Sequence, residues 1–138
     1  MKRIILTIIA LTLCLAVFSG CKKQDAELPP FEPPTSEGVS SVSVSSFPGE
    51  YNYLFTGEDA KKVIDYFSEI ELTTDYDENP NELTGMTLKV TITYDDGNTE
   101  TLYEISPFIR TEEGAWYKII QSESSDFYTL LNELAGEE

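Results

Sequence analysis

The sequence predicts an α+β domain of two layers, in which two helices pack on one face of an antiparallel meander sheet in the order β-α-β-β-β-α. Three observations lead to this fold class. Residues 86–94 alternate between apolar and polar side chains, as a half-buried strand does, and a hairpin signal follows at Asp96-Gly97. Residues 56–70 and 124–135 carry apolar residues at helical spacing. Short hairpins imply that neighbouring strands are antiparallel. The apolar stripes of both helices must be buried, and the one apolar face of the sheet is the surface that can cover them.

The remaining strands follow from the same alternation. Residues 39–47 are rich in β-branched side chains and alternate, Pro48-Gly49 interrupt them, and residues 51–55 alternate again as a second short strand or a continuation past a bend. Pro107 ends or bends the second strand of the hairpin, and residues 115–120 form the next strand.

The hairpin turn sets the expected pairing of its two strands. A two-residue turn pairs Tyr94 with Thr99 and Val90 with Tyr103, so that the apolar face continues across the hairpin. The other face of the sheet is then expected to carry polar side chains, namely Thr87, Thr91, Thr93 and Glu104.

Both helices have recognisable ends. The first is expected to begin at Thr56, with Asp59 three residues later as in a capping box. Its apolar stripe is Ala60, Val63, Ile64, Phe67 and Ile70. Opposite charges four residues apart are expected to pair on its exposed side, as Glu58 with Lys62 and Lys61 with Asp65. The last helix is expected to begin near Ser124 or Ser125 and to end at Gly136, with a stripe of Phe127, Leu130, Leu131 and Leu134.

The N-terminus has the pattern of a secretory signal. Met1-Lys2-Arg3 give a positive start, residues 4–18 are largely apolar, and Ser19-Gly20 are small residues directly before Cys21. The segment Val17-Phe18-Ser19-Gly20-Cys21 resembles the lipobox of bacterial lipoproteins, with Phe18 where that class prefers Leu.

The resemblance implies cleavage between Gly20 and Cys21 and attachment of diacylglycerol to the thiol of Cys21, often with a further acyl chain, such as palmitate, on the new amino terminus. The mature protein is then expected in the cell envelope, anchored to the membrane through lipid on Cys21 and facing outside the cytoplasm. Two or three acyl chains anchor a protein stably, whereas one is marginal. An ordinary secretory signal with a chance cysteine, or an uncleaved anchor, is the alternative.

Three parts of the chain are therefore expected: a signal peptide over residues 1–20, a lipidated cysteine and Pro-rich acidic tether over residues 21–38, and a small α+β domain over residues 39–138. Two proline pairs in the tether favour extended polyproline II, and its composition argues against packing. We expect a spacer that holds the domain away from the bilayer.

The net charge of the chain limits the classes of partner that it can bind. The chain has 25 acidic and 9 basic residues and a net charge of −16. Nucleic acid is disfavoured, because its phosphates require Lys and Arg. A cationic protein or peptide is the partner that such a field attracts, although acidity also simply keeps a surface protein soluble.

Catalytic and metal-binding groups are scarce. The sequence has no histidine, and loss of the signal peptide would leave Cys21 as the sole cysteine, so a Ser-His or Cys-His triad is excluded and no enzyme is expected. No cofactor is expected, with calcium as the exception to consider. Carboxylate and amide oxygens recur in one acidic loop, at Asp75, Asp77, Asn79 and Glu82, and calcium takes such ligands. A solvated acidic loop is the simpler interpretation, because Pro80 and Met86 depart from an EF-hand.

Aromatic residues offer one further lead. Tyr51, Tyr53, Trp116 and Tyr117 are candidates for a recognition patch or for the core, and alternation places Trp116 and Tyr117 on opposite sheet faces. The sequence thus favours a non-catalytic binding or accessory lipoprotein. An inhibitor or decoy of a cationic protein and a calcium-dependent adhesion module are the alternatives.

Overall fold

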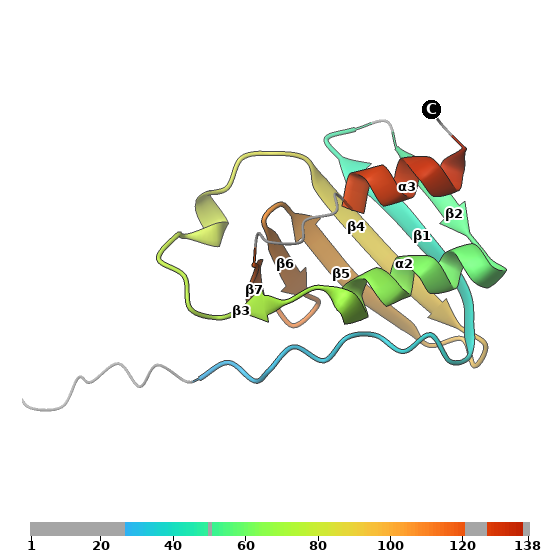
Figure 1. Cartoon of the computed structure of the whole chain (residues 1–138), viewed down its shortest axis with the longest axis horizontal. Coiled ribbons are helices and arrows are strands. Elements are labelled where there is room, and N and C mark those ends of the chain that lie inside the picture. The colour runs from blue at the N-terminus through green and yellow to red at the C-terminus, as the bar shows by residue number, and fades with distance from the viewer. Residues whose placement is uncertain (1–26, 50, 121–126, 137–138) are drawn as a thin grey trace, which may run out of the picture.

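The structure is a computed structural model that describes residues 27–49, 51–120 and 127–136. Within these residues a seven-stranded antiparallel sheet carries two helices on one face (Figure 1), which confirms the α+β class predicted from the sequence. The elements in chain order are β1 (Val39–Phe47), β2 (Asn52–Phe55), α2 (Gly57–Glu69), β3 (Leu72–Thr73), the 3-10 turn η1 (Pro80–Glu82), β4 (Thr87–Tyr94), β5 (Thr99–Ile105), β6 (Phe108–Thr111), β7 (Trp116–Ile119) and α3 (Phe127–Ala135).

The strand order is β2-β1-β4-β5-β6-β7-β3. Strands β4 to β7 form an antiparallel meander with one strand more than expected, whereas the β1–β2 hairpin extends the sheet on one side and β3 closes it on the other. Strands β3 and β6 were not expected from the sequence. They have two and four residues, which is too short for alternation to be recognised.

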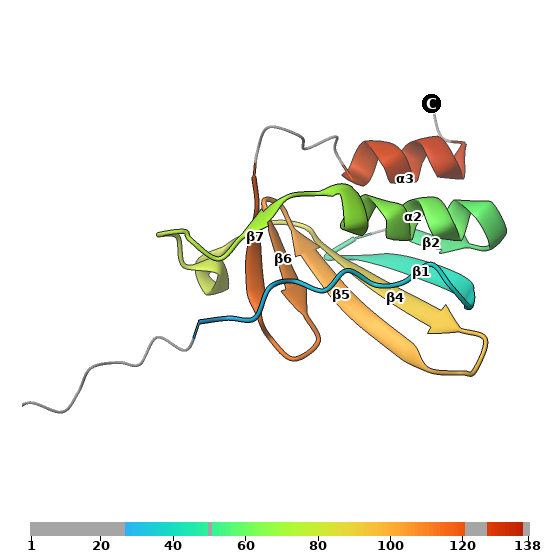
Figure 2. The same cartoon turned by 60° about the horizontal axis from the view of Figure 1, so that its bottom comes forward.

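The core lies between the sheet and the helices (Figure 2). The predicted stripe of α2 is buried at Ala60, Val63, Ile64 and Phe67, and α3 contributes Phe127 and Leu131. The ring of Phe127 lies 4.6 Å from that of Tyr66 and 5.2 Å from that of Phe67, measured between centroids, so α3 is fixed to α2 by aromatic contacts. Each fully buried Val, Ile, Leu or Phe side chain among them stabilises the fold by about 1.5–3 kcal/mol.

The start of α2 differs in detail from the prediction. Thr56 occupies the N-cap position in extended backbone, but its side chain makes no capping hydrogen bond. The ion pairs join residues three apart, Lys61 with Glu58 at 2.7 Å and Lys62 with Asp59 at 3.2 Å, rather than four apart. All four side chains are largely exposed, so these pairs add little stability.

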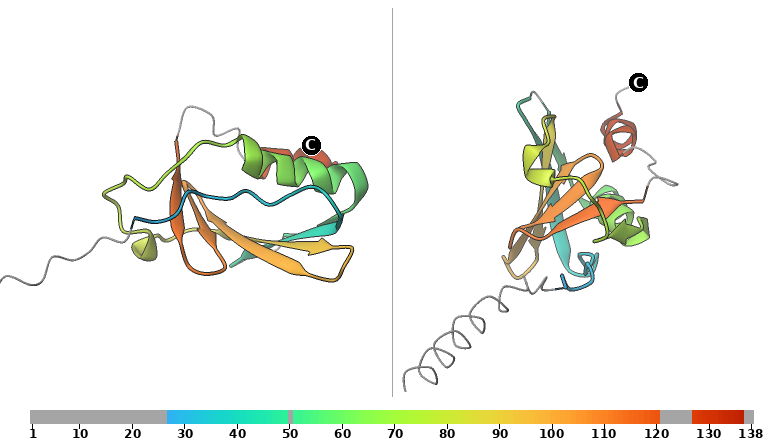
Figure 3. Two further views of the ribbon diagram at one scale, coloured as in Figure 1. Left: turned by 90° about the horizontal axis from the view of Figure 1, so that it is seen from below. Right: turned by 90° about the vertical axis from the view of Figure 1, so that its left-hand side faces the viewer.

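Residues 27–38, which we call the strap, pack against the domain, and the expectation of a free spacer is wrong for them. The strap runs alongside α2 on the helical side of the sheet (Figure 3, left). The Tyr117 hydroxyl donates a hydrogen bond of 2.9 Å to the Pro29 carbonyl, and the rings of Phe31 and Tyr117 meet edge to face at 5.3 Å. Pro34 is buried. The strap therefore covers apolar sheet surface that α2 and α3 leave uncovered.

The pairing of β4 with β5 differs by one residue from the prediction. Thr93 lies opposite Thr99, and Lys89, rather than Val90, lies opposite Tyr103. The connection is a three-residue loop, because the Tyr94 amide donates to the Asn98 carbonyl at 2.9 Å and the Gly97 amide donates to the Tyr94 carbonyl at 2.9 Å. Gly97 has a φ of 85°, as in a turn followed by a glycine bulge.

A shift of one residue moves every side chain of β5 to the opposite sheet face. Leu102 and Glu104 face the core beside Val90 and Leu88 and are buried, so the expected position of Glu104 on the outer face is wrong. Tyr103 and Ile105 face outward instead, in the place expected for polar side chains.

The positive φ of Gly97 predicts a specific effect of substituting this glycine. Gly97→Ala should cost about 1–2 kcal/mol of unfolding free energy, because an L-residue is strained at this positive φ although no atom lies within 4 Å of the added methyl. Gly85→Ala is the matched control: its added methyl also has no neighbour within 4 Å, and its φ is not positive, so stability should change by less than about 0.5 kcal/mol. Urea unfolding of both variants measures this, and equal costs would contradict the loop geometry.

Candidate functional site: a groove on the open sheet face

The face of the sheet turned away from α2 and α3, which we call the open face, carries a row of polar and aromatic side chains. Ser45, Lys89, Tyr103, Arg110 and Trp116 are directly paired from one strand to the next across β1, β4, β5, β6 and β7. Cross-strand partners lie about 4.5–5.5 Å apart at Cβ, so these five side chains form a continuous line. The β4–β5 register brings Tyr103 into this line.

The connection from β3 to β4, residues 74–86, folds over one end of the open face and includes η1, which lies on the other side of the sheet from the helices (Figure 3, left). The Tyr76 ring meets the Phe108 ring edge to face at 5.0 Å, and the Tyr76 hydroxyl donates to the Trp116 carbonyl at 3.2 Å. Burial raises the pKa of Tyr76, so the hydroxyl stays protonated to a higher pH than that of an exposed tyrosine. Lys118 on β7 forms an ion pair with Glu78.

A groove of about 560 Å³ lies between this loop and the strands. Pro80, Asn81 and Leu83 form its loop wall. Its floor and second wall come from the strands, with Ser45, Ser46, Phe47, Thr87, Lys89, Tyr103, Ile105, Arg110 and Trp116. Phe47 is 78% exposed, which is unusual for a large apolar side chain and leaves it available at the rim.

Arg110 lies among aromatic rings. Its guanidinium carbon is 4.4 Å from the centroid of the Tyr103 ring and 5.6 Å from that of the Trp116 ring, both within cation–π range. The Nε atom of Arg110 is buried without a hydrogen-bond partner in the part of the chain that the structure describes. A buried donor on a charged group is costly to leave unsatisfied, so an acceptor brought to this guanidinium would be favourable.

The charges of the groove stand out against the acidic chain. Of the five basic side chains among the described residues, Lys61, Lys62 and Lys118 form ion pairs. Lys89 and Arg110 form none there, and both line the groove. In a chain with a net charge of −16, two unpaired cations on either side of Tyr103 in one row make a local positive site.

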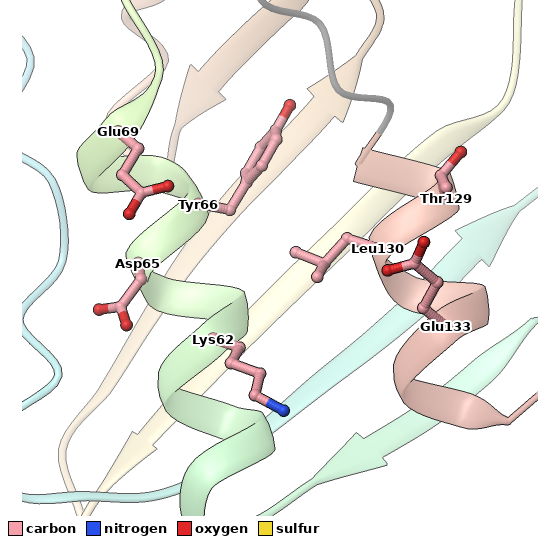
Figure 4. A pocket seen from close by; sticks show the side chains of 7 residues that line it. All are labelled: Lys62, Asp65, Tyr66, Glu69, Thr129, Leu130 and Glu133. Carbon is pink, nitrogen blue, oxygen red and sulfur yellow. The ribbon is translucent and has the colours of Figure 1, made fainter.

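A second depression of about 480 Å³ lies between α2 and α3 (Figure 4). Its lining includes three acids, Asp65, Glu69 and Glu133, together with Tyr66 and the apolar Leu130, which projects toward α2. Its one cation, Lys62, is already paired with Asp59. A cationic partner of the kind expected from the net charge suits this interhelical cleft, whereas the open-face groove suits an anion.

The proposed calcium ligands do not converge. In the described part of the chain no group of three or more acidic, cysteine or histidine side chains is placed to hold a metal ion. The Asn79 side chain is occupied, because its nitrogen donates to Glu82 at 2.9 Å and its oxygen accepts from the Asn81 amide at 3.2 Å. Asp75 and Asp77 lie exposed before η1. The loop is a wall of the groove rather than a cage of oxygen ligands.

The candidate aromatic residues divide as alternation predicts. Tyr117 is buried against the strap, and Trp116 lies half-buried on the open face. Tyr51 and Tyr53 stack at 6.0 Å on the helical side, where Tyr51 meets Tyr128 of α3 at 5.4 Å. These two tyrosines therefore help to hold α3 in place.

Cys21 and Gly20, with the rest of the expected signal peptide, lie outside the described residues, as does the predicted start of the last helix at Ser124 or Ser125. Neither described helix is long and apolar enough to span a bilayer. Comparisons of this chain with models of protein families, with characterised proteins and with solved structures found no match.

The geometry of the acidic loop predicts its response to calcium. Adding about 5 mM calcium chloride, which exceeds the dissociation constants of most extracellular calcium modules, should leave the melting temperature unchanged. Magnesium chloride at the same concentration is the control for ionic strength. A rise of several degrees with calcium alone, lost in Asp77→Asn, would show that the loop rearranges into a calcium site.

Proposed function

We propose that this chain is a lipid-anchored, extracytoplasmic lipoprotein whose domain is a non-catalytic binding module, with the open-face groove as its ligand site. The lipobox-like segment ending at Cys21 supports lipid anchoring and the extracytoplasmic location. The observation that carries the binding role is the groove itself, where the unpaired Lys89 and Arg110 meet aromatic and apolar side chains. Concave sites of a few hundred cubic ångströms with few converging polar groups are typical ligand sites.

The composition of the groove supports binding rather than catalysis. Its lining contains no carboxylate, cysteine or histidine, which are the usual general acids, bases and nucleophiles. Its two charged side chains are both cations, which hold and orient an anion. Its hydroxyl and amide groups, from Ser45, Thr87 and Asn81, add hydrogen-bonding capacity at the edges.

Lipid anchoring at Cys21 is tested by metabolic labelling with an alkyne fatty acid in a bacterial host that processes lipoproteins. The wild-type chain should carry label, and Cys21→Ala should abolish it, because the thioether forms on that sulfur. Cys14→Ala is the matched control and should keep the label, since Cys14 lies within the apolar signal run. Label that survives Cys21→Ala would refute lipid anchoring at this residue.

The binding role is tested by ligand retention. The whole chain is incubated with an envelope extract and repurified, and the bound compounds are identified by mass spectrometry. We expect a compound that the wild type retains and that Lys89→Gln/Arg110→Gln retains at least about tenfold less, which corresponds to about 1.4 kcal/mol of binding free energy.

Lys61→Gln/Lys62→Gln is the matched control, because it also removes two cations but lies on α2, away from the groove. It should retain the compound like the wild type. Equal retention by all three proteins, with melting curves that show each is folded, would exclude the groove as the ligand site.

A further inference from the structure

We propose that the open-face groove selects a small organic molecule that carries a single carboxylate on an apolar body. This inference rests on the proposed function, because it assigns a ligand class to the same groove. Three features of the described residues define that class: the geometry of Arg110, the charge of the whole chain, and the position of the groove on inner strands.

The geometry of Arg110 favours a carboxylate. Tyr103 and Trp116 lie 4.4 Å and 5.6 Å from its guanidinium carbon, and such stacking orients the planar group. Stacked faces leave the edge of a guanidinium to donate, and two parallel N–H donors on that edge match the two oxygens of a carboxylate. Lys89 neighbours the same Tyr103 from the other side and supplies a second positive charge without a preferred plane.

The charge of the chain argues for one anionic group rather than many. The two groove cations belong to a chain whose net charge is −16. Lys89 and Arg110 are the charged side chains of the groove lining. Charges farther than a Debye length of about 8 Å are screened, so a ligand confined to the groove avoids most of the acidic surface. A polyphosphate, a nucleic acid or an anionic membrane extends beyond the groove and meets the acidic surface, which repels it.

The position of the groove argues for a small molecule rather than an extended peptide. Peptides that add to a sheet bind a free edge through main-chain hydrogen bonds. The groove lies over β4, β5 and β6, which have neighbours on both sides, so their backbone groups are already paired in the sheet. Side chains alone face the ligand, and Ile105, Leu83, Pro80 and Trp116 provide apolar contact for its body.

The test uses the only tryptophan of the chain, Trp116, whose fluorescence reports on the groove directly. The whole chain in phosphatidylcholine nanodiscs is titrated with cyclohexanecarboxylate and, separately, with the neutral cyclohexanecarboxamide of the same shape. We expect the carboxylate to bind at least tenfold more tightly than the amide. Long-chain inorganic polyphosphate should bind more weakly, per molecule, than the carboxylate.

Variants assign the selectivity to the two cations. Arg110→Gln should abolish the preference for the acid over the amide, Arg110→Lys should keep part of it, and the exposed Lys89→Gln should reduce it several-fold. Lys61→Gln should leave both affinities unchanged. Because Lys89 is exposed, its variant should fold normally even if Arg110 variants do not.

Equal affinity for the acid and the amide, tighter binding of polyphosphate, or no change in Trp116 fluorescence at carboxylate concentrations of tens of millimolar would each overturn the ligand class. If one of these results appears while an envelope compound is still lost from Lys89→Gln/Arg110→Gln, the groove remains the ligand site and only the assignment to an apolar carboxylate fails. If neither the probe nor any envelope compound depends on the two cations, the proposed function fails as well.

Discussion

The register between β4 and β5 is the constraint on which the rest of the structure depends. It is set at the three-residue loop, where Gly97 takes a positive φ and the Tyr94 and Asn98 backbones close the turn. Side chains alternate between the two faces of a strand. This loop therefore decides which alternate side chains of β5 face the helices. Leu102 then packs in the core beside Val90 of β4, and Tyr103 lies on the open face between Lys89 and Arg110. Core and groove are two results of the same turn.

A groove on this face also requires a wall, and the sheet alone cannot supply one. The chain between β3 and β4 provides it by packing Tyr76 on Phe108 and by the ion pair of Glu78 with Lys118. These contacts cover the β6–β7 end of the open face and leave the middle accessible. The two faces of the sheet are therefore covered unequally: the helices and the strap cover one face, and a single loop covers part of the other (Figure 3).

Much of the fold was predictable because it follows from periodicity. The α2 stripe, the strong alternation of β4 and the opposite orientation of Trp116 and Tyr117 all depend on spacing within one element. The groove was not predictable, because it depends on register between elements. The dipeptide Asp96-Gly97 suits a two-residue turn as well as a bulged three-residue one, and the wrong choice placed Tyr103 in the core and hid its relation to Lys89 and Arg110. The strap was missed for a similar reason. Its composition indicates a spacer, and the deciding contacts come from Phe31 and from Tyr117, which lies 86 positions further along the chain.

The docked strap limits how far the domain can extend from the membrane, provided that Cys21 carries lipid as proposed. A free polyproline spacer from Cys21 to Gly38 would extend about 50 Å at 3.1 Å per residue. With residues 27–38 fixed to the domain, only the chain from Cys21 to Glu27 separates lipid from protein, and six residues span at most about 20 Å. The volume open to the domain around its anchor then falls by roughly an order of magnitude. The protein would sample a thin layer next to the bilayer surface and meet those ligands that arrive at, or leave from, the membrane.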